Sequence, residues 1–475
     1  MNYEKLQFMC GIEIHQQIEG KKLFCNCPTK IKKEKSDYTF TRKLRASAGE
    51  TGNIDKAAQY ELQKSKEFEY HAYKDSNCLV EQDEEPPHNV NKEALKSAIT
   101  IAKMLNMKIV DEIQFMRKTV IDGSNVSGFQ RTALIGYSGY IEIKGKKIRI
   151  ETLCLEEESA QTIKRTPTKD YYNISRLGIP LIEIATAPDI NTPEECKDAA
   201  AKLGMILRSI PNCKRGIGSI RQDVNISINK GNRVEIKGFQ DIRRIPQVIN
   251  KEIQRHEEII KKGKKVESEV RKVEPNDATT YLRPMPGADR MYPETDIETI
   301  NTEKIQIKIP ETIDEKTKRY QETYKLSKDL AENIVKKETK TEKNYEEIFK
   351  KYTTKNLTPT NIANIYLSQI PNTEKKQEQK IKQEDIEKIL DALKKEEVPL
   401  SAIQDILTDA AKQELNLKKY ETINEDEIKK TIKKIIQENE NAPTGLIMGK
   451  TMTALKGRAD GKKVKEILDS MKKIN

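Results

Sequence analysis

The chain has 475 residues, of which 34% are charged and only 5% aromatic, with no tryptophan. This length can bury a large core and predicts two to four domains. No apolar run approaches the roughly 20 residues of a membrane-spanning helix, and the N-terminus lacks the layout of a secretory signal. Seven unevenly spread cysteines agree with a reducing compartment. We therefore expect a cytoplasmic protein without membrane segments.

The formal net charge of +11 favours a polyanionic partner, because clustered Lys and Arg side chains neutralise phosphates and release counterions. A lysine-rich composition is also typical of genomic base bias or of heat adaptation. Charge alone leaves these interpretations equally open.

The first predicted element is a β-strand over residues 11–18, "GIEIHQQI". Its apolar residues alternate, which places Glu13 and His15 together on the other face. Taken alone, such a pair is more typical of a solvated strand face than of a site.

Cysteines follow in a Cys25–Cys27 pair, and Cys78 and His88 could complete a four-ligand zinc site. The spacing is irregular and there is no second close Cys pair. Buried or merely adjacent thiols are therefore the default interpretation, with zinc as the alternative.

A loop of small residues, "DGSNVSGFQRT" at 122–132, precedes the next β-like region. Its backbone N–H groups could cradle phosphates, with Arg131 as a charged clamp, so we expect Ser127 and Gly128 to line an ATP site. The same composition is also typical of an ordinary turn.

Three adjacent acids, Glu156, Glu157 and Glu158, end a predicted β-ribbon that turns at "KGKK". Like charges at this spacing repel unless a cation lies among them. The cluster therefore indicates a metal.

Later strands also carry acids among apolar residues. Glu183 lies in "IPLIEIATAPD", Asp223 and Asn225 share one face of "DVNISI", and "RVEIKGF" adds Glu235 and Lys237. A lone carboxylate in a buried strand costs free energy. Several such strands in one domain could converge on a shared site, and oxygen ligands with few imidazoles suit Mg²⁺. The pattern predicts magnesium-dependent phosphoryl chemistry, with Lys237 at the nucleotide.

The composition and the spacing of apolar residues change near residue 300. Beyond it glycine becomes rare and apolar residues recur three and four positions apart, as in amphipathic helices. The segment "TGLIMGKT" resembles a Walker A loop, but only three residues separate Gly445 from Gly449, where the P-loop needs four. We reject a P-loop there.

Eight ordered blocks along the whole chain resemble a family within the glutamyl-tRNA(Gln) amidotransferases, which comprises the archaeal E subunit and the bacterial and organellar B subunit. The blocks include "GIEIHQQIEGKKLFCNCPT", "LEEESAQT", "SRLGIPLIEIATAPDI" and "MGKTMTALKGRADGKKV". The segments "SGFQRT" and "RMYPETD" are similar to the archaeal form.

The resemblance implies an ATP- and Mg²⁺-dependent enzyme, a carbon-nitrogen ligase with glutamine as amido-N donor (EC 6.3.5.-). Members bind tRNA(Gln) mischarged with glutamate, phosphorylate its γ-carboxylate and let ammonia displace the phosphate. Ammonia reaches them through a tunnel from an asparaginase-like D subunit, in a heterodimer or a dimer of heterodimers.

The resemblance also implies site residues. Glu13, His15, Glu157 and Glu183 match the positions expected to hold magnesium and carry the catalysis. Mg²⁺ would offset the negative charge of these carboxylates, and the γ-phosphate of ATP would be aligned there for transfer.

The chain departs from the archaeal family members in two respects. These members carry an insertion similar to part of aspartyl-tRNA synthetase between the cradle-shaped domain and the helical region, and residues 254–287 run straight through that place. Ser159 stands where the bacterial form has a nearby acid, which leaves the assignment of the acids around it open.

We therefore predict an α+β fold: a cradle-shaped catalytic domain at 1–300, a helical domain at 301–404 and a helical tail at 405–475. The tail is expected to bind tRNA phosphates, although a solvated helix face would show the same lysines. The candidate residues are Arg458, Lys462, Lys463 and Lys465.

Two other classes remain as alternatives. A non-catalytic RNA-binding or assembly protein explains the charge but not the acids that recur in β-runs. A ligase that acts on a free metabolite explains the acids but not the basic helical region.

Overall fold

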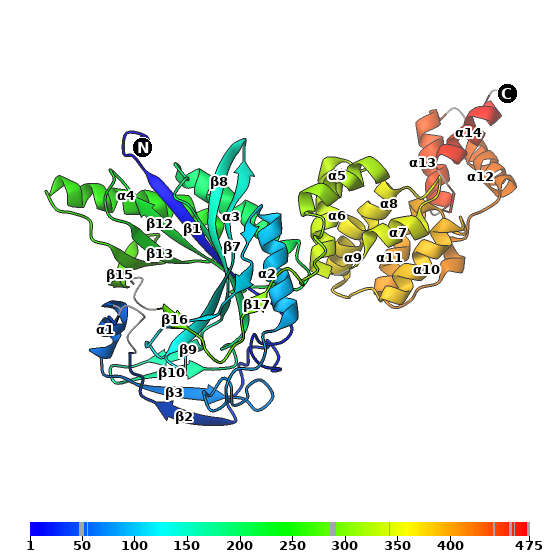
Figure 1. Cartoon of the computed structure of the whole chain (residues 1–475). Coiled ribbons are helices and arrows are strands. Elements are labelled where there is room, and N and C mark those ends of the chain that lie inside the picture. The colour runs from blue at the N-terminus through cyan, green and yellow to red at the C-terminus, as the bar shows by residue number, and fades with distance from the viewer. Residues whose placement is uncertain are drawn as a thin grey trace. The chain divides into compact units, whose positions relative to one another are not determined.

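The chain divides into two units, Met1–Glu311 and Thr312–Asn475 (Figure 1). The first is mixed α+β and the second is helical, which confirms the predicted fold class. The computed structural model describes residues 1–46, 52–54, 56–285, 291–341, 343–439, 442–455, 458–459 and 461–472.

An eleven-stranded sheet organises the first unit. Neighbouring strands are antiparallel, except that β13 and β14 are parallel. In spatial order the strands are β15 (Thr279–Pro284), β14 (Glu269–Val273), β13 (Val234–Phe239), β12 (Ile220–Ser227), β1 (Met9–Gln17), β11 (Pro180–Thr186), β8 (Lys146–Glu157), β7 (Phe129–Ile143), β6 (Met116–Thr119) and β16 (Met291–Pro293), with β4 (Lys108–Ile109) on β7.

One face of this sheet is apolar and lies under helices. Ile12 and Ile14 of β1 are almost fully buried there. The helices α2 (Lys92–Met104), α3 (Pro193–Arg208) and α4 (Ile245–Lys261) join the same core, and α3 packs against β1 and α4 (Figure 1). The polar residues that alternate with these isoleucines are thereby directed to the other face.

The predicted ribbon is the β7–β8 hairpin. Its turn is formed by Lys144 and Gly145, both with positive φ (49° and 82°). Two consecutive residues with positive φ give a turn whose twist matches that of the strands. The hairpin delivers the acids at the end of β8 to the middle of the sheet.

A second sheet holds the loop before β7. Its strands are β2 (Tyr38–Arg42), β3 (Glu67–Ala72), β10 (Lys169–Asn173) and β9 (Gln161–Arg165). Tyr70 and Tyr172 are fully buried and stack, and their hydroxyls donate to the carbonyls of Gly123 (2.9 Å) and Asp122 (2.7 Å). The first unit also contains α1 (Lys56–Leu62), a short 3₁₀ turn (Ile242–Arg244), and a strand pair, β5 (Glu112–Ile113) with β17 (Ile300–Asn301).

The second unit has two hydrophobic cores. The first joins α5 (Ile313–Tyr324), α6 (Lys328–Thr341), α7 (Tyr345–Tyr352), α8 (Pro359–Asn364), a π-helical turn (Ile365–Gln369), α9 (Ile370–Gln377), α10 (Gln383–Lys394), two 3₁₀ turns (Leu400–Ala402 and Leu417–Tyr420) and α11 (Ile403–Ala411). The second joins α12 (Glu425–Glu438), α13 (Thr444–Ala454) and α14 (Gly461–Lys472).

Both predicted boundaries need correction. Residue 300 begins β17, which pairs with β5, and Ile305 still packs on the core of the first unit. Residue 405 falls within α11, and the first helical core extends to Tyr420. The second helical core begins at Ile428, because α12 supplies its first buried face.

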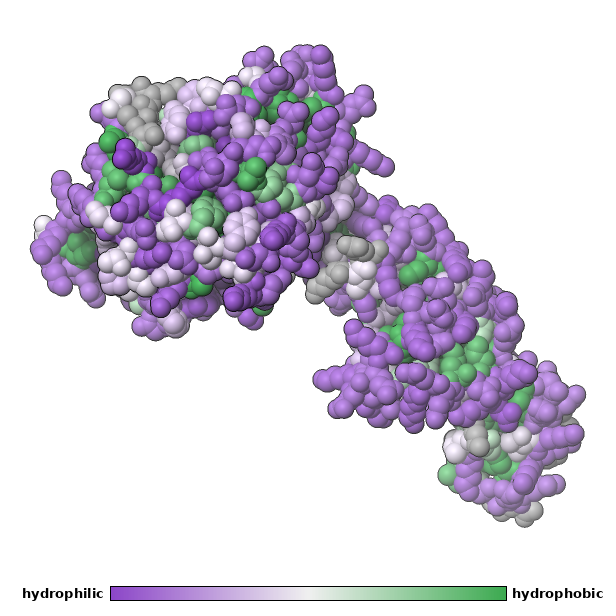
Figure 2. Space-filling view, turned by 90° about the horizontal axis from the view of Figure 1, so that it is seen from below, coloured by the Kyte–Doolittle hydropathy of each residue, from purple (hydrophilic) through white to green (hydrophobic). Residues whose placement is uncertain are grey.

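The face of the molecule in Figure 2 is mainly hydrophilic, with scattered hydrophobic patches. None of the helices in the described part of the chain is both long enough and apolar enough to cross a membrane.

We expect Ile14→Ala to lower the stability of the first unit by about 2–5 kcal/mol, because it opens a cavity under the central strand. Urea unfolding followed by circular dichroism measures this change. Ile217→Ala is the matched control, since Ile217 is 97% exposed and should change stability little. Equal midpoints for the two variants would contradict the burial of Ile14.

Candidate active site

The polar face of the large sheet forms a cavity of about 540 Å³, a volume typical of small-molecule sites. Charged groups dominate its lining. The acids are Glu13, Asp122, Glu156, Glu158, Glu183, Asp223 and Glu235, and the bases are His15, Lys118, Arg176, Arg221, Arg233, Lys237 and Arg283.

The central strand β1 contributes Glu13 and His15, as predicted. Cross-strand pairing places Glu13 beside Asp223 of β12, and His15 between Arg221 of β12 and Glu183 of β11. Side chains paired across strands in this way share one face of the sheet. The acids found in separate sequence segments therefore converge, as expected.

His15 and Glu183 form a contact of 3.2 Å between Nε2 and Oε2. Burial opposes protonation of His15, but the bond to Glu183 outweighs it and raises the pKa of His15. Burial also opposes ionisation of Glu183, yet Lys118 and His15 hold the pKa of Glu183 well below its usual range. Glu183 is thus a carboxylate beside an imidazole that retains its proton more readily than usual.

Glu156 lines the cavity and accepts from three donors. The Lys118 ammonium lies 2.5 Å from its Oε1, the Thr132 hydroxyl donates to the same oxygen at 2.7 Å, and the Gln130 amide donates to Oε2 at 3.0 Å. Burial and the nearby Glu183 raise the pKa of Glu156. Lys118 also lies 3.9 Å from Glu183, so one cation serves both acids.

Glu158 lies on the same face and is also almost fully buried. Both of its carboxylate oxygens accept from Arg221 at 2.9 Å, and Gln17 donates to Oε2 at 2.9 Å. Burial works against ionisation, but Arg221 and Arg176 lower the pKa of Glu158 below its usual range. Glu158 is therefore an ionised, oriented member of the wall.

Glu157 lies on the opposite face, which corrects its predicted role as a metal ligand. Its carboxylate accepts from the Arg131 backbone N–H and guanidinium, both at 3.3 Å, and Arg131 also donates to the buried Glu294 at 2.7 Å. Neither Glu157 nor Arg131 lines the cavity. The pleat of β8 alternates the three glutamates, so Glu156 and Glu158 reach the cavity and Glu157 does not.

The predicted phosphate loop also needs correction. The Ser127 hydroxyl donates to the Phe129 carbonyl at 3.0 Å, and Gly128, at φ 79°, closes a local turn. Neither lines the cavity, although Asp122 and Ser124 of the same loop do. The small residues here serve a turn, which was the alternative interpretation of this segment.

Lys237 lines the cavity, and its role at the nucleotide stays a prediction. It donates to Asp223 at 2.7 Å and pairs with Glu235. Burial opposes its charge, but Asp223 and Glu235 raise the pKa of Lys237. Its ammonium lies among the acids of β12 and β13.

Three of these acids form a group that fits a divalent metal. Carboxylate oxygens of Glu13, Asp223 and Glu235 lie within 4.8 Å of one another. Burial, Glu235 and Glu183 raise the pKa of Glu13, as expected for acids that lack sufficient neutralising charge. Asn225 donates to Glu13 at 3.0 Å, and its buried Oδ1 has no partner among the described residues. This donor set suits Mg²⁺.

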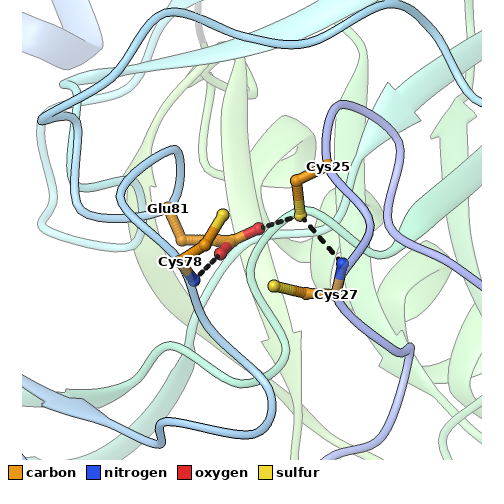
Figure 3. A group of neighbouring side chains, drawn as sticks. All are labelled: Cys25, Cys27, Cys78 and Glu81. Atoms are coloured by element: carbon orange, nitrogen blue, oxygen red, sulfur yellow. Dashed lines mark hydrogen bonds between the residues drawn. The ribbon is translucent and has the colours of Figure 1, made fainter.

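A second cluster gathers three of the predicted thiols (Figure 3). Ligand atoms of Cys25, Cys27, Cys78 and Glu81 lie within 4.8 Å of one another, and Cys25 Sγ donates to Glu81 at 2.8 Å. His88, the fourth ligand considered from the sequence, instead lies 2.9 Å from Glu85. Three thiols and a carboxylate fit tetrahedral zinc.

We expect the purified chain to contain about one zinc ion, and Cys78→Ser to lose most of it, because three ligands hold zinc less tightly than four. Elemental analysis after dialysis against a mild chelator measures the metal content. Cys213→Ser is the control, since Cys213 is buried outside the cluster. A wild-type chain without zinc would contradict the zinc site and leave the three cysteines as adjacent free thiols.

The predicted nucleic-acid residues lie in the segment that forms the second helical core, but none of the described ones is part of that core. Arg458 is half-buried, and Lys463 and Lys465 are exposed on α14, while the Lys462 side chain lies outside the described residues. Their role in tRNA binding stays a prediction.

The rejected P-loop segment is part of helix α13, which agrees with its rejection.

The fold and the cavity define a class of protein. In this class a mixed β-sheet carries a cavity lined by paired acidic and basic side chains, and a helical unit follows the sheet in the chain. Residues 8–309 match the family model described as the GatB/GatE catalytic domain, and residues 343–471 match the GatB domain. The chain therefore belongs to the GatB/GatE family.

Curated relatives, each named as the E subunit of glutamyl-tRNA(Gln) amidotransferase, match along most or all of the chain. The protein from Methanocaldococcus jannaschii is 34% identical over 98% of this chain and 99% of its own length. The protein from Archaeoglobus fulgidus is 36% identical over 77% of this chain and 79% of its own length. The protein from Methanosarcina barkeri is 33% identical over 98% of both.

The alignment with the M. jannaschii protein extends over 625 positions, whereas this chain has 475 residues. At least 150 positions (625 less 475) are therefore occupied by the relative alone. A difference of this size agrees with the missing insertion noted in the sequence.

Proposed function

We propose that this chain is the catalytic component that converts glutamyl-tRNA(Gln) to glutaminyl-tRNA(Gln) in the cytoplasm, for protein synthesis. The proposal depends chiefly on one observation: acids from β1, β11, β8, β12 and β13 converge in one cavity with matched cations. The names of the relatives supply the substrate.

In the proposed reaction, ATP transfers its γ-phosphoryl group to the γ-carboxylate of the tRNA-bound glutamate. Ammonia then attacks the carbonyl carbon, a C–N bond forms, and the C–O bond to phosphate breaks. Ammonia loses a proton in this step, and phosphate leaves. The whole reaction is ligation of ammonia to a carboxylate with hydrolysis of ATP.

The cavity residues would bind and orient these groups. Glu13, Asp223 and Glu235 would hold Mg²⁺, which would neutralise charge on the transferred phosphoryl group. Lys118 and Lys237, held by Glu156 and Asp223, would supply positive charge to the oxygens of a bound phosphate. Glu156 and Glu183 hold Lys118 in place, and Glu183 orients His15.

The ammonia would come from a partner, an asparaginase-like glutaminase known as the D subunit, in a heterodimer or a dimer of heterodimers. The relatives are themselves named as one component of an amidotransferase, which supports an assembly of several components.

A non-catalytic RNA-binding role is the second candidate, favoured only by the basic helical unit. ATP turnover measured with and without mischarged tRNA separates the two.

We expect Glu156→Gln to reduce amidation roughly 10–100-fold, because the neutral side chain no longer anchors Lys118. Conversion of labelled glutamyl-tRNA with ATP and an ammonium salt measures the rate. Glu151→Gln is the control, since Glu151 lies exposed on the same strand outside the cavity. A fully active Glu156→Gln variant would contradict the assigned site.

The tail residues give a separate test. If Arg458 and Lys465 contact phosphates, their joint replacement by Ala should flatten the slope of log K against log salt by roughly 0.7–0.9 per lost contact. Filter binding of tRNA across a salt series measures the slope, with Lys388→Ala on α10 as the control. Unchanged slopes would show that other surfaces bind the tRNA.

A further inference from the structure

Arg283 differs from most other cations of the cavity, because no acid in the described part of the chain forms an ion pair with it. Lys118, Arg221 and Lys237 each pair with a cavity acid. Arg283 is half-buried, and among the described residues its side chain has no hydrogen-bond or ion-pair partner. A guanidinium kept unpaired inside a cavity is suited to an anionic group of a substrate, and its planar donors match a phosphate.

Arg283 is carried by β15, a strand at the end of the sheet. Among the described strands β15 pairs with β14 alone, and all of its residues are exposed or half-buried. An end strand has few contacts of its own that fix its position. Whatever fixes β15 therefore also decides where Arg283 lies.

The fixed point is Glu252 on helix α4. Its side chain is 1% exposed, and its Oε2 accepts from the Thr279 hydroxyl at 2.5 Å, at the first residue of β15. Its Oε1 accepts from Arg255 at 2.6 Å and lies 3.2 Å from His256. Burial opposes the charge, but the bonds to His256, Arg255 and Thr279 lower the pKa of Glu252 to about 2. Glu252 is therefore an ionised, fully engaged acceptor.

Further bonds extend this attachment over the β14–β15 hairpin. Arg271 of β14 donates to the hydroxyl and the carbonyl of Thr279, at 2.7 and 2.8 Å. At the turn, Arg244 donates to Asp277 at 2.7 Å and to the Glu274 carbonyl at 2.8 Å. Glu252 thus meets both strands of the hairpin, since it contacts Thr279 of β15 directly and lies 3.7 Å from Arg271 of β14.

We propose that Glu252 is a positioning residue for substrate binding: it fixes the β14–β15 hairpin so that Arg283 meets a phosphate group of the substrate. This inference rests on the proposed function, in which both ATP and tRNA bring phosphates to the cavity. In both cases Arg283 would bind a phosphate oxyanion, and the kinetic test shows whether that phosphate belongs to ATP or to the tRNA.

The test is steady-state kinetics of the full-length chain, with KM measured separately for ATP and for glutamyl-tRNA and an ammonium salt as the nitrogen source. We expect Arg283→Ala to raise one of the two KM values about 10-fold or more, with a smaller change in kcat. Glu252→Gln should raise the same KM. In the Arg283→Ala background, Glu252→Gln should raise it no further, because the residue through which it acts is gone.

Two further variants make the result decisive. Thr279→Val keeps the shape of the side chain and removes only its hydroxyl, so it should shift the same KM in a folded protein. Glu258→Gln is the matched control, since Glu258 is exposed on the same helix. A Glu252→Gln variant with a lower melting temperature and an unchanged KM would overturn the inference. The inference would also be wrong if Glu252→Gln raised KM by the same factor in the wild-type and Arg283→Ala backgrounds.

Failure of the proposed function gives a different result. A wild-type chain that binds ATP and tRNA without amidating glutamyl-tRNA would contradict the proposed function. The same variants, compared by their dissociation constants, would then still decide whether Glu252 acts through Arg283.

Discussion

The pleat of the β-strand is the constraint on which this protein depends. Successive side chains point to opposite faces, so one strand can contribute both to an apolar core and to a charged cavity. In β1, Ile12 and Ile14 are buried under helices while Glu13 and His15 line the cavity. The large apolar face stabilises the sheet, and the sheet then holds the charged groups at fixed spacing.

The cavity is arranged so that repulsion between acids is offset by nearby cations. Lys118 neutralises Glu156, and Lys237 neutralises Asp223. Such buried pairs contribute little net stability, because removing the charges from water costs about as much as their attraction returns. The arrangement is therefore better explained by the chemistry of the cavity than by the stability of the fold, which depends on the apolar face.

Much of the sheet could be predicted because alternation is a local signal. The strands around Glu13, Glu183 and Asp223 were recognisable from their isoleucines and valines, and their acids do converge. Three consecutive glutamates, in contrast, do not reveal which of them faces the cavity, since a shift of one residue exchanges the faces. The choice of Glu157 was wrong for this reason. The residues missed by sequence reasoning have partners distant in the chain: Lys118 meets Glu156 from 38 residues away, and nothing in the pattern around it indicates a cavity residue.

The corrected position of Arg131 explains how three adjacent acids can end one strand. Glu156 and Glu158 are neutralised from the cavity side, by Lys118 and Arg221. Glu157 is neutralised from the other side by Arg131, which Glu294 in turn orients. Without that partner, the charge of Glu157 would lie buried behind the cavity and would raise the cost of ionising both neighbours. Arg131 therefore shapes the electrostatics of the cavity without entering it, and the run of three glutamates is tolerated because its charges are divided between two faces.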